Sequence, residues 1–314
     1  MLLNNILFFL LSATFLILSG IVLVRSLTKM ARFLRISEFT SAFIIMAVAT
    51  SLPELFVGIS SALQGNPALS LGNVVGANII DLTIITGIFV LLGRGIRIDT
   101  HKVGRDVYFM LLSIILVIVL FFIGRSLSRF DGLILVALFG FNLFRMLRKR
   151  KNYPAKFVDG RIKRWEIIFN TLLFVFALAV LFVSSHFATQ YATLIAIDLD
   201  LPQIIVGLFL ISIATTLPEL VFGIEAIMMG HKSMVIGDQT GTVFTNICLV
   251  LGLAAIIHPI TAEYFSFLVA GIFMFISAFM FTAFVQSGKR LDILEGLGLV
   301  MLYVAFAIIE FFVK

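Results

Sequence analysis

The chain has few charged residues and a single cysteine. Only 13% of its 314 residues are Asp, Glu, Lys or Arg, and 61% are hydrophobic, whereas soluble domains contain about 25% charged residues. This scarcity of charge excludes an ordinary soluble domain. The lone Cys248 excludes a disulfide scaffold and a cysteine-rich metal site. We therefore expect a polytopic membrane protein.

The sequence also shows no phosphate-binding loop and no nucleophile–base pair. We accordingly expect no enzyme activity and no cofactor. The net charge of +6 could suit nucleic acid, but the Lys and Arg residues gather in a few short loops, which is a pattern of membrane topology. The expected partners are inorganic cations and membrane lipid, with no nucleic acid and no required protein partner, so that the chain would act as a monomer.

Apolar runs of about twenty residues, the length that crosses a bilayer as a helix, recur along the chain. Leu2 to Ser19 has no positive residue before it, so we interpret it as a membrane span and not as a signal peptide. The predicted spans cover residues 5–24, 39–63, 70–92, 107–124, 131–147, 166–185, 201–229, 234–257, 265–286 and 292–313.

Most of the positive residues lie in alternate connections between these spans. Residues 25–35 and 94–105 each carry four Lys or Arg residues, and the connection at 145–164 carries nine. The positive-inside rule then places both termini outside and the basic linker in the cytoplasm of a multi-pass plasma-membrane protein. We interpret the linker as a topogenic charge cluster that also contacts anionic lipid; a regulatory partner site is the alternative.

The chain contains an internal repeat. Ala49-Thr-Ser-Leu-Pro-Glu54-Leu returns 165 residues later as Ala214-Thr-Thr-Leu-Pro-Glu219-Leu. Biased composition matches leucines by chance but does not easily align Pro-Glu together with five glycines. The glycines paired at the same spacing are Gly58 with Gly223, Gly65 with Gly230, Gly72 with Gly237, Gly76 with Gly241 and Gly87 with Gly252.

Each copy of the motif belongs to a set of five spans, and this odd number inverts the second set relative to the first. Inverted repeats are a recurring architecture of secondary transporters, with the ion site near the midplane of the membrane. We predict an all-α membrane protein of ten transmembrane helices, built as two inverted five-helix repeats. The first repeat covers 1–147 with its motif at 39–92, a basic linker covers 148–165, and the second repeat covers 166–314 with its motif at 201–257.

Prolines within the spans are expected to disturb the helices that carry the motif. Pro53 and Pro218 lack a backbone N–H, so each should kink or break its helix and free the carbonyl of Ala49 or Ala214. A carbonyl freed at membrane depth needs protein, water or an ion as a partner. A simple packing kink is the alternative. Hydroxyl groups precede the acids by about one turn, at Thr50, Ser51, Thr215 and Thr216.

Acidic side chains at membrane depth give the motif its chemistry. Glu54 and Glu219 would be costly there unless they were paired, protonated or bound to a cation. Asp81 and Asn246 follow them in glycine-bearing spans that can pack closely, and none of these four spans contains Lys or Arg. An anionic site made of oxygen ligands suits a hard cation such as Ca²⁺. Na⁺ can use the same oxygens, and H⁺ is the alternative neutraliser.

The two blocks resemble the α-repeats of the cation/Ca²⁺ exchanger superfamily, in particular its prokaryotic sodium/calcium exchanger type. The specific matches are Ala-Thr-Ser-Leu-Pro-Glu54 and Gly72-Asn-Val-Val-Gly76-Ala-Asn78. The resemblance implies that Glu54 and Glu219 coordinate Ca²⁺. It also implies that Thr50, Ser51, Thr215 and Thr216 supply hydroxyls to flanking Na⁺ sites, and that Ala47 and Ser212 lend backbone carbonyls.

The sequence departs from this family at several ligand positions. Typical prokaryotic members have Asn where this chain has Asp81 and Asp where it has Asn246, so that the pair is exchanged. Ala77 replaces a usual Ser and removes a hydroxyl. In the second repeat, Gly237-Asp238-Gln-Thr-Gly241-Thr242-Val243 replaces Gly-Asn-x-x-Gly-Ser-Asn, where Thr242 is expected to keep the hydroxyl role. These departures bear on Na⁺ dependence more than on Ca²⁺ binding.

The resemblance implies secondary active antiport of Ca²⁺ against Na⁺ by alternating access, with the first and sixth spans as the sliding elements. An exchanger of the same fold that couples a divalent cation to H⁺ is the first alternative, and a passive cation channel is the second. Two further acids have more than one interpretation. Glu225 either lines a cytoplasmic half-channel, or snorkels or pairs with Lys232. Asp238 is interpreted as a helix-start residue in preference to an access-path ligand.

Overall fold

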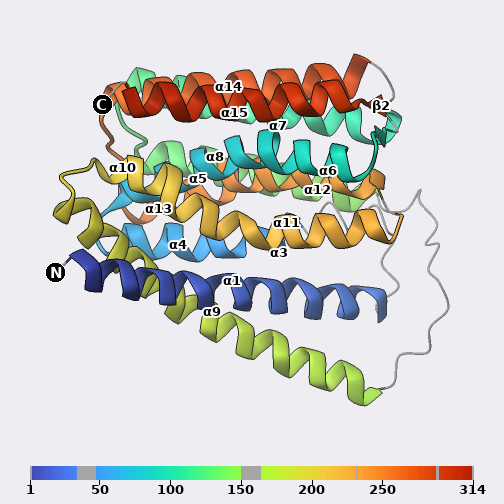
Figure 1. Cartoon of the computed structure of the whole chain (residues 1–314), viewed down its shortest axis with the longest axis horizontal. Helices are drawn as coiled ribbons and strands as arrows, with labels where there is room; N and C mark the ends of the chain where they lie inside the picture. The colour runs from blue at the N-terminus through green and yellow to red at the C-terminus, as the bar shows by residue number, and fades with distance from the viewer. Residues whose placement is uncertain are drawn as a thin grey trace.

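The computed structural model describes residues 2–33, 47–98, 100–149, 164–230, 232–287 and 290–312, which form an almost entirely helical bundle (Figure 1). Eight helical stretches in these ranges are long and apolar enough to cross a membrane. The expected helical membrane class is therefore confirmed. The described ranges also contain a small antiparallel sheet, in which β1 (Ile96–Arg97) pairs with β2 (Arg290–Leu291).

Helices of the first half follow the predicted spans. The part of the second span at 39–46 and the linker residues 150–163 lie outside the described residues. The helices are α1 (Leu2–Phe33), α3 (Ala47–Thr50), α4 (Leu52–Leu63), α5 (Pro67–Ile80), η2 (Asp81–Ile85), α6 (Thr86–Leu92), α7 (Thr100–Gly124) and α8 (Arg129–Lys149), of which η2 is a π-helical turn.

Helices of the second half contain two further π-helical turns, η4 and η5. The elements are α9 (Arg164–Asp198), α10 (Gln203–Val206), η4 (Gly207–Ile211), α11 (Ser212–Met228), α12 (Lys232–Thr245), η5 (Asn246–Val250), α13 (Leu251–Ile257), α14 (Tyr264–Ser287) and α15 (Ile293–Phe312).

Helices α1 and α9 extend well beyond the apolar runs predicted at 5–24 and 166–185. An apolar run marks only the part of a helix that is long enough to cross the lipid. No proline or glycine interrupts α9 from its start until Pro202, beyond its last residue, so the helix continues into more polar sequence. Both helices are therefore longer than a minimal membrane span.

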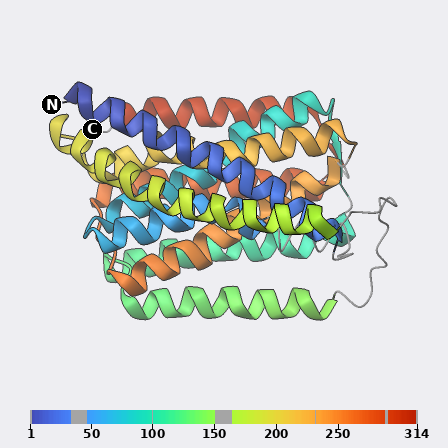
Figure 2. The same ribbon diagram turned by 90° about the horizontal axis from the view of Figure 1, so that it is seen from below.

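Helices α1 and α9 pack along one another at the edge of the bundle (Figures 1 and 2). Their apolar side chains form a hydrophobic cluster of their own with parts of α4, α5, α10, η4 and α11. Gly20 of α1 lies against the rings of Pro53 and Pro218, where an added Cβ would come within 3.4 Å and 2.7 Å of ring carbons. Helix α1 thus packs against both motifs.

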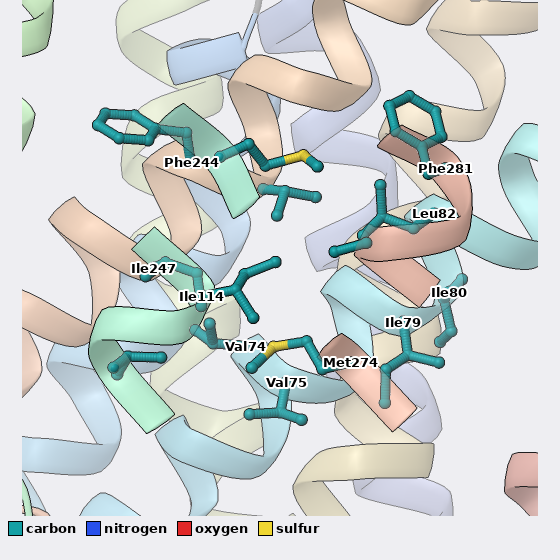
Figure 3. Packing of buried hydrophobic residues seen from close by; sticks show 14 of the residues in the cluster. Val74, Val75, Ile79, Ile80, Leu82, Ile114, Phe244, Ile247, Met274 and Phe281 are labelled. Atoms are coloured by element: carbon teal, nitrogen blue, oxygen red, sulfur yellow. The ribbon is translucent and has the colours of Figure 1, made fainter. Parts of the chain in front are cut away.

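The α5–η2–α6 and α12–η5–α13 segments lie inside the bundle, with 83% and 78% of their most apolar windows buried. Figure 3 shows buried side chains from these segments and from α7 and α14 packed together, including Val74, Ile114, Phe244 and Met274. The main hydrophobic core therefore surrounds the two segments that carry Asp81 and Asn246.

Candidate cation-binding site

The two Pro-Glu motifs differ in backbone. Helix α3 ends at Thr50 and α4 begins at Leu52, so the first motif breaks its helix at Ser51 as predicted. In the second motif α11 continues through Pro218, so the predicted disturbance does not break the helix there, although proline still lacks the N–H that would bond to Ala214. The carbonyls of Ala49 and Ala214 lose their usual helical donor in both cases, and both residues are buried.

Glycines bring α5 against α10 and η4. A Cβ added at Gly72 would overlap the carbonyl oxygen of Ile204, and one added at Gly76 would overlap Leu208. In return, Gly207 of η4 faces the backbone of α5, where an added Cβ would lie 2.7 Å from the amide nitrogen of Asn73. The expected close approach of glycine-bearing helices is present here, and it joins elements from the two halves.

Asp81 and Asn246 each open a π-helical turn, η2 and η5, at the same 165-residue spacing as the Pro-Glu motifs. A π-turn places one extra residue in the helical turn and is frequently found at functional sites. Sequence reasoning missed these turns because they have no composition signal. Their recurrence at equivalent positions supports a shared backbone design in the two halves.

Three predicted carboxylates are buried without hydrogen bonds. Glu54, Asp81 and Glu219 have no exposed surface, and none of their six carboxylate oxygens has a hydrogen-bond partner among the described residues. The three groups repel one another electrostatically, with Glu54 acting on both Asp81 and Glu219. A buried, unpaired carboxylate is strongly unfavourable, so this arrangement calls for a cation or protons.

The carboxylates alone do not form a chelating cluster. In the described ranges no group of three or more Asp, Glu, His or Cys residues lies close enough together to hold a metal ion. A cation would therefore need hydroxyl, amide and backbone oxygens as well, which are common ligands of Ca²⁺.

Hydroxyl and carbonyl oxygens gather on one side around the first motif. The Thr50 and Thr242 hydroxyls lie 3.2 Å apart, and Thr50 Oγ1 lies 3.4 Å from the Ala47 carbonyl oxygen. We call Ala47, Thr50 and Thr242 the Thr50 flank. The nearby Ser51 hydroxyl is buried and has no hydrogen-bond partner among the described residues.

A second group of oxygens surrounds the other motif. Thr215 Oγ1 lies 3.1 Å from Asn73 Oδ1 and 3.2 Å from the Ser212 carbonyl oxygen, and we call these three residues the Thr215 flank. Thr216 donates to the same Ser212 carbonyl at 2.9 Å. Between the halves, Asn246 Nδ2 donates to Asn78 Oδ1 at 3.2 Å, which leaves Asn246 Oδ1 without a partner.

Two interpretations of single acids are corrected by the structure. Asp238 is not at a helix start: it lies seven residues into α12, is fully buried and has two unpartnered oxygens. Glu225 does not pair with Lys232. Instead, Arg25 of α1 forms an ion pair with it, and Lys232 donates to the Gly93 carbonyl at 2.7 Å. Only the placement of α12 within the bundle reveals Asp238 as a buried acid.

Comparison with known proteins gives the family. The profile of the family described as sodium/calcium exchanger protein matches residues 4–148 and 169–312, which is most of the chain. The chain belongs to this family. The resemblance of the two motifs to the cation/Ca²⁺ exchanger superfamily is thereby confirmed.

Similar proteins match the chain over most or all of their length. The chain is 26% identical to the sodium/calcium exchanger MaX1 of Methanosarcina acetivorans over 98% of this chain and 99% of that protein. It is 29% identical to the putative antiporter CaxA of Alkalimonas amylolytica over 79% and 81% of the two chains. A solved structure of the sodium-calcium exchanger NCX_Mj, soaked with Na⁺ and Sr²⁺, matches with a TM-score of 0.70 at 22% identity over 97% and 98% of the chains. The fold is therefore that of a membrane exchanger.

Proposed function

We propose that this protein is a secondary antiporter that exchanges Ca²⁺ for Na⁺ across the membrane by alternating access. Family membership and the relatives named as exchangers support this function. The observation that carries it is the set of buried carboxylates from both halves, Glu54, Asp81 and Glu219, without hydrogen-bond partners among the described residues. Such a site is stable only when cations or protons fill it.

The proposed architecture is ten transmembrane helices in two inverted repeats, at 1–147 and 166–314. The regions matched by the family profile begin at residues 4 and 169, again 165 residues apart. Glycine contacts also recur: an added Cβ at Gly87 would lie 2.9 Å from the Gly296 carbonyl oxygen, and one at its repeat partner Gly252 would lie 3.1 Å from the Gly132 carbonyl oxygen. A two-fold relation between the halves explains both observations.

We further propose that the termini lie outside the cell and the linker at 148–165 lies in the cytoplasm of the plasma membrane. The first and last helices begin and end at the same end of the bundle (Figures 1 and 2). The opposite end carries β2 with Arg290 and its partner strand with Arg97 (Figure 1). Positive residues at that end fit the cytoplasmic side.

The proposed ligands of the transported ions come from both halves. Glu54 and Glu219 would hold Ca²⁺ at the centre, and the hydroxyls and carbonyls of the two flanks would hold Na⁺. Hard cations prefer oxygen ligands, so these sites need only side-chain and backbone oxygen atoms as ligands. The complete proposed set is Glu54, Glu219, Asp81, Asn246, Thr50, Ser51, Thr215, Thr216, Ala47, Ser212 and Thr242.

The burial of these acids explains why transport would be an exchange. An empty site would carry uncompensated charges in a low-dielectric interior, so its conformational change would be strongly disfavoured. Filling the site with either cation relieves this penalty and permits the change of access. The separate hydrophobic cluster of α1 and α9 supports these helices as the elements that slide.

The test is Ca²⁺ uptake into proteoliposomes loaded with Na⁺. We expect uptake that depends on the Na⁺ gradient and stops when the gradient is dissipated. Asp200→Asn, a change of an exposed acid in the turn after α9, should behave as wild type. Uptake driven by a pH gradient and indifferent to Na⁺ would select the H⁺-coupled alternative. Ca²⁺ flux without any counter-ion would select a channel.

A further inference from the structure

Helix α12 carries a polar segment that the predicted site does not use. Asp238 and Gln239 are fully buried, and all four of their side-chain oxygen and nitrogen atoms lack hydrogen-bond partners among the described residues. Four residues further on, Thr242 lies on the same face of the helix and its hydroxyl reaches Thr50. The Asp238 carboxylate therefore stands about one turn from the Thr50 flank.

The repeat gives Asp238 a structural counterpart. Asn73 lies 165 residues earlier, and its side-chain oxygen accepts a hydrogen bond from Thr215 at 3.1 Å. Helix α12 packs against α3, which carries Thr50. Asp238 therefore occupies the position of Asn73 one repeat later, but its carboxylate makes no such hydrogen bond among the described residues, and it brings a negative charge where Asn73 brings a neutral amide.

The number of buried negative charges around the site supports the binding of a cation beside Asp238. Asp238 repels both Asp81 and Glu219 electrostatically, so it belongs to the same field as the central acids. Together with Glu54 these acids make four fully buried carboxylates in one electrostatic field, and the ion pairs found among the described residues involve none of the four. One divalent cation balances only two charges, which leaves the equivalent of two negative charges to be compensated.

We propose that Asp238 is a Na⁺ ligand and makes the Thr50 flank the tighter of two unequal Na⁺ sites. The carboxylate adds charge to the Ala47 carbonyl and the Thr50 and Thr242 hydroxyls. On the opposite flank, the equivalent position holds the Asn73 amide, and Ala77 has no hydroxyl to match Thr242. This inference rests on the proposed exchange function. It adds that the two flanks bind Na⁺ with unequal affinity.

The experiment measures Ca²⁺ binding to purified wild type and Asp238→Asn protein by isothermal titration, with and without Na⁺. We expect the Na⁺ concentration that halves Ca²⁺ binding to rise roughly tenfold or more in the variant, because a buried charge beside the ion is removed. Ca²⁺ affinity in Na⁺-free buffer should fall by a smaller factor than the Na⁺ competition does, because the Glu54 and Glu219 carboxylates that would hold Ca²⁺ are retained.

Asp200→Asn is the matched control, because it makes the same change at an exposed position. Asp238→Ser provides a second variant if the first does not elute as a monodisperse peak. Na⁺ competition equal to that of wild type, or a response to pH alone, would overturn the proposal. Loss of Ca²⁺ binding in Na⁺-free buffer would also overturn it, by placing Asp238 in the divalent site. A wild type without any Na⁺ competition would instead contradict the exchange function itself.

Discussion

The Thr50 flank and the Thr215 flank have the same origin in the repeat but different chemistry. Thr50 contacts a second hydroxyl, that of Thr242. The helix that carries Thr242, α12, also carries the buried Asp238 one turn earlier. Thr215 contacts the amide of Asn73, and the residue equivalent to Thr242 is Ala77. The repeat therefore fixes which residue positions surround the site, whereas single substitutions decide which oxygen atoms and how much charge each side presents.

The central acids provide the strongest test, because there the halves should be equivalent. Glu54→Gln and Glu219→Gln should each reduce Na⁺-dependent Ca²⁺ uptake by roughly a hundredfold or more, since each removes a charge that lies against the cation. Uptake into proteoliposomes, with protein amount matched by size-exclusion chromatography, is the measurement. Retained uptake in only one variant would contradict an equal role for Glu54 and Glu219. Retained uptake in both variants would contradict the proposed Ca²⁺ site itself.

The glycine contacts give the next largest effect, on stability. Gly76→Ala should destabilise the protein by about 1–3 kcal/mol, because its Cβ would overlap the backbone of Leu208. The control is Gly140→Ala in α8, where nothing lies within 4 Å of an added Cβ and alanine favours the helix by up to about 1 kcal/mol. Thermal melting in detergent should show a lower midpoint for the first variant only. Equal midpoints would argue against close packing of α5 on η4.

Adding a hydroxyl to one flank or removing one from the other should have a smaller effect, which we expect in the affinity for Na⁺. Ala77→Ser adds an oxygen beside the Thr215 flank and should strengthen Na⁺ competition severalfold, while Thr242→Ala should weaken it by a similar factor, as expected for about 1 kcal/mol per ligand. The measurement is Ca²⁺ binding across a Na⁺ series. A shift of the same sign in both variants would contradict the assignment of one hydroxyl to each flank.

The smallest effect is expected at the surface of α11. Arg25 and Glu225 form an ion pair in which their side chains are 57% and 39% exposed, and such pairs contribute about 0–1 kcal/mol. Glu225→Gln should therefore change the melting midpoint little and Ca²⁺ uptake less than about twofold. A large loss of uptake with unchanged melting would instead support a half-channel role for Glu225.

Local sequence predicted much of the helical fold but not its irregularities. Apolar runs located the membrane helices, and Pro53 correctly predicted a break between α3 and α4. Pro218 did not break α11, because surrounding helices can hold a proline-containing helix continuous. The π-turns at Asp81 and Asn246 have no signature in residue type and are visible only in the folded chain.

For the candidate site, the repeat alone determined that Glu54 and Glu219 occupy equivalent places, since a constant spacing aligns the two motifs residue by residue. Only the tertiary structure decided that Thr50 meets Thr242, that Thr215 meets Asn73 and that Asp238 is buried. These contacts join residues more than a hundred positions apart. A sequence specifies which groups need a partner, but the packing of helices from both halves decides which partners they find.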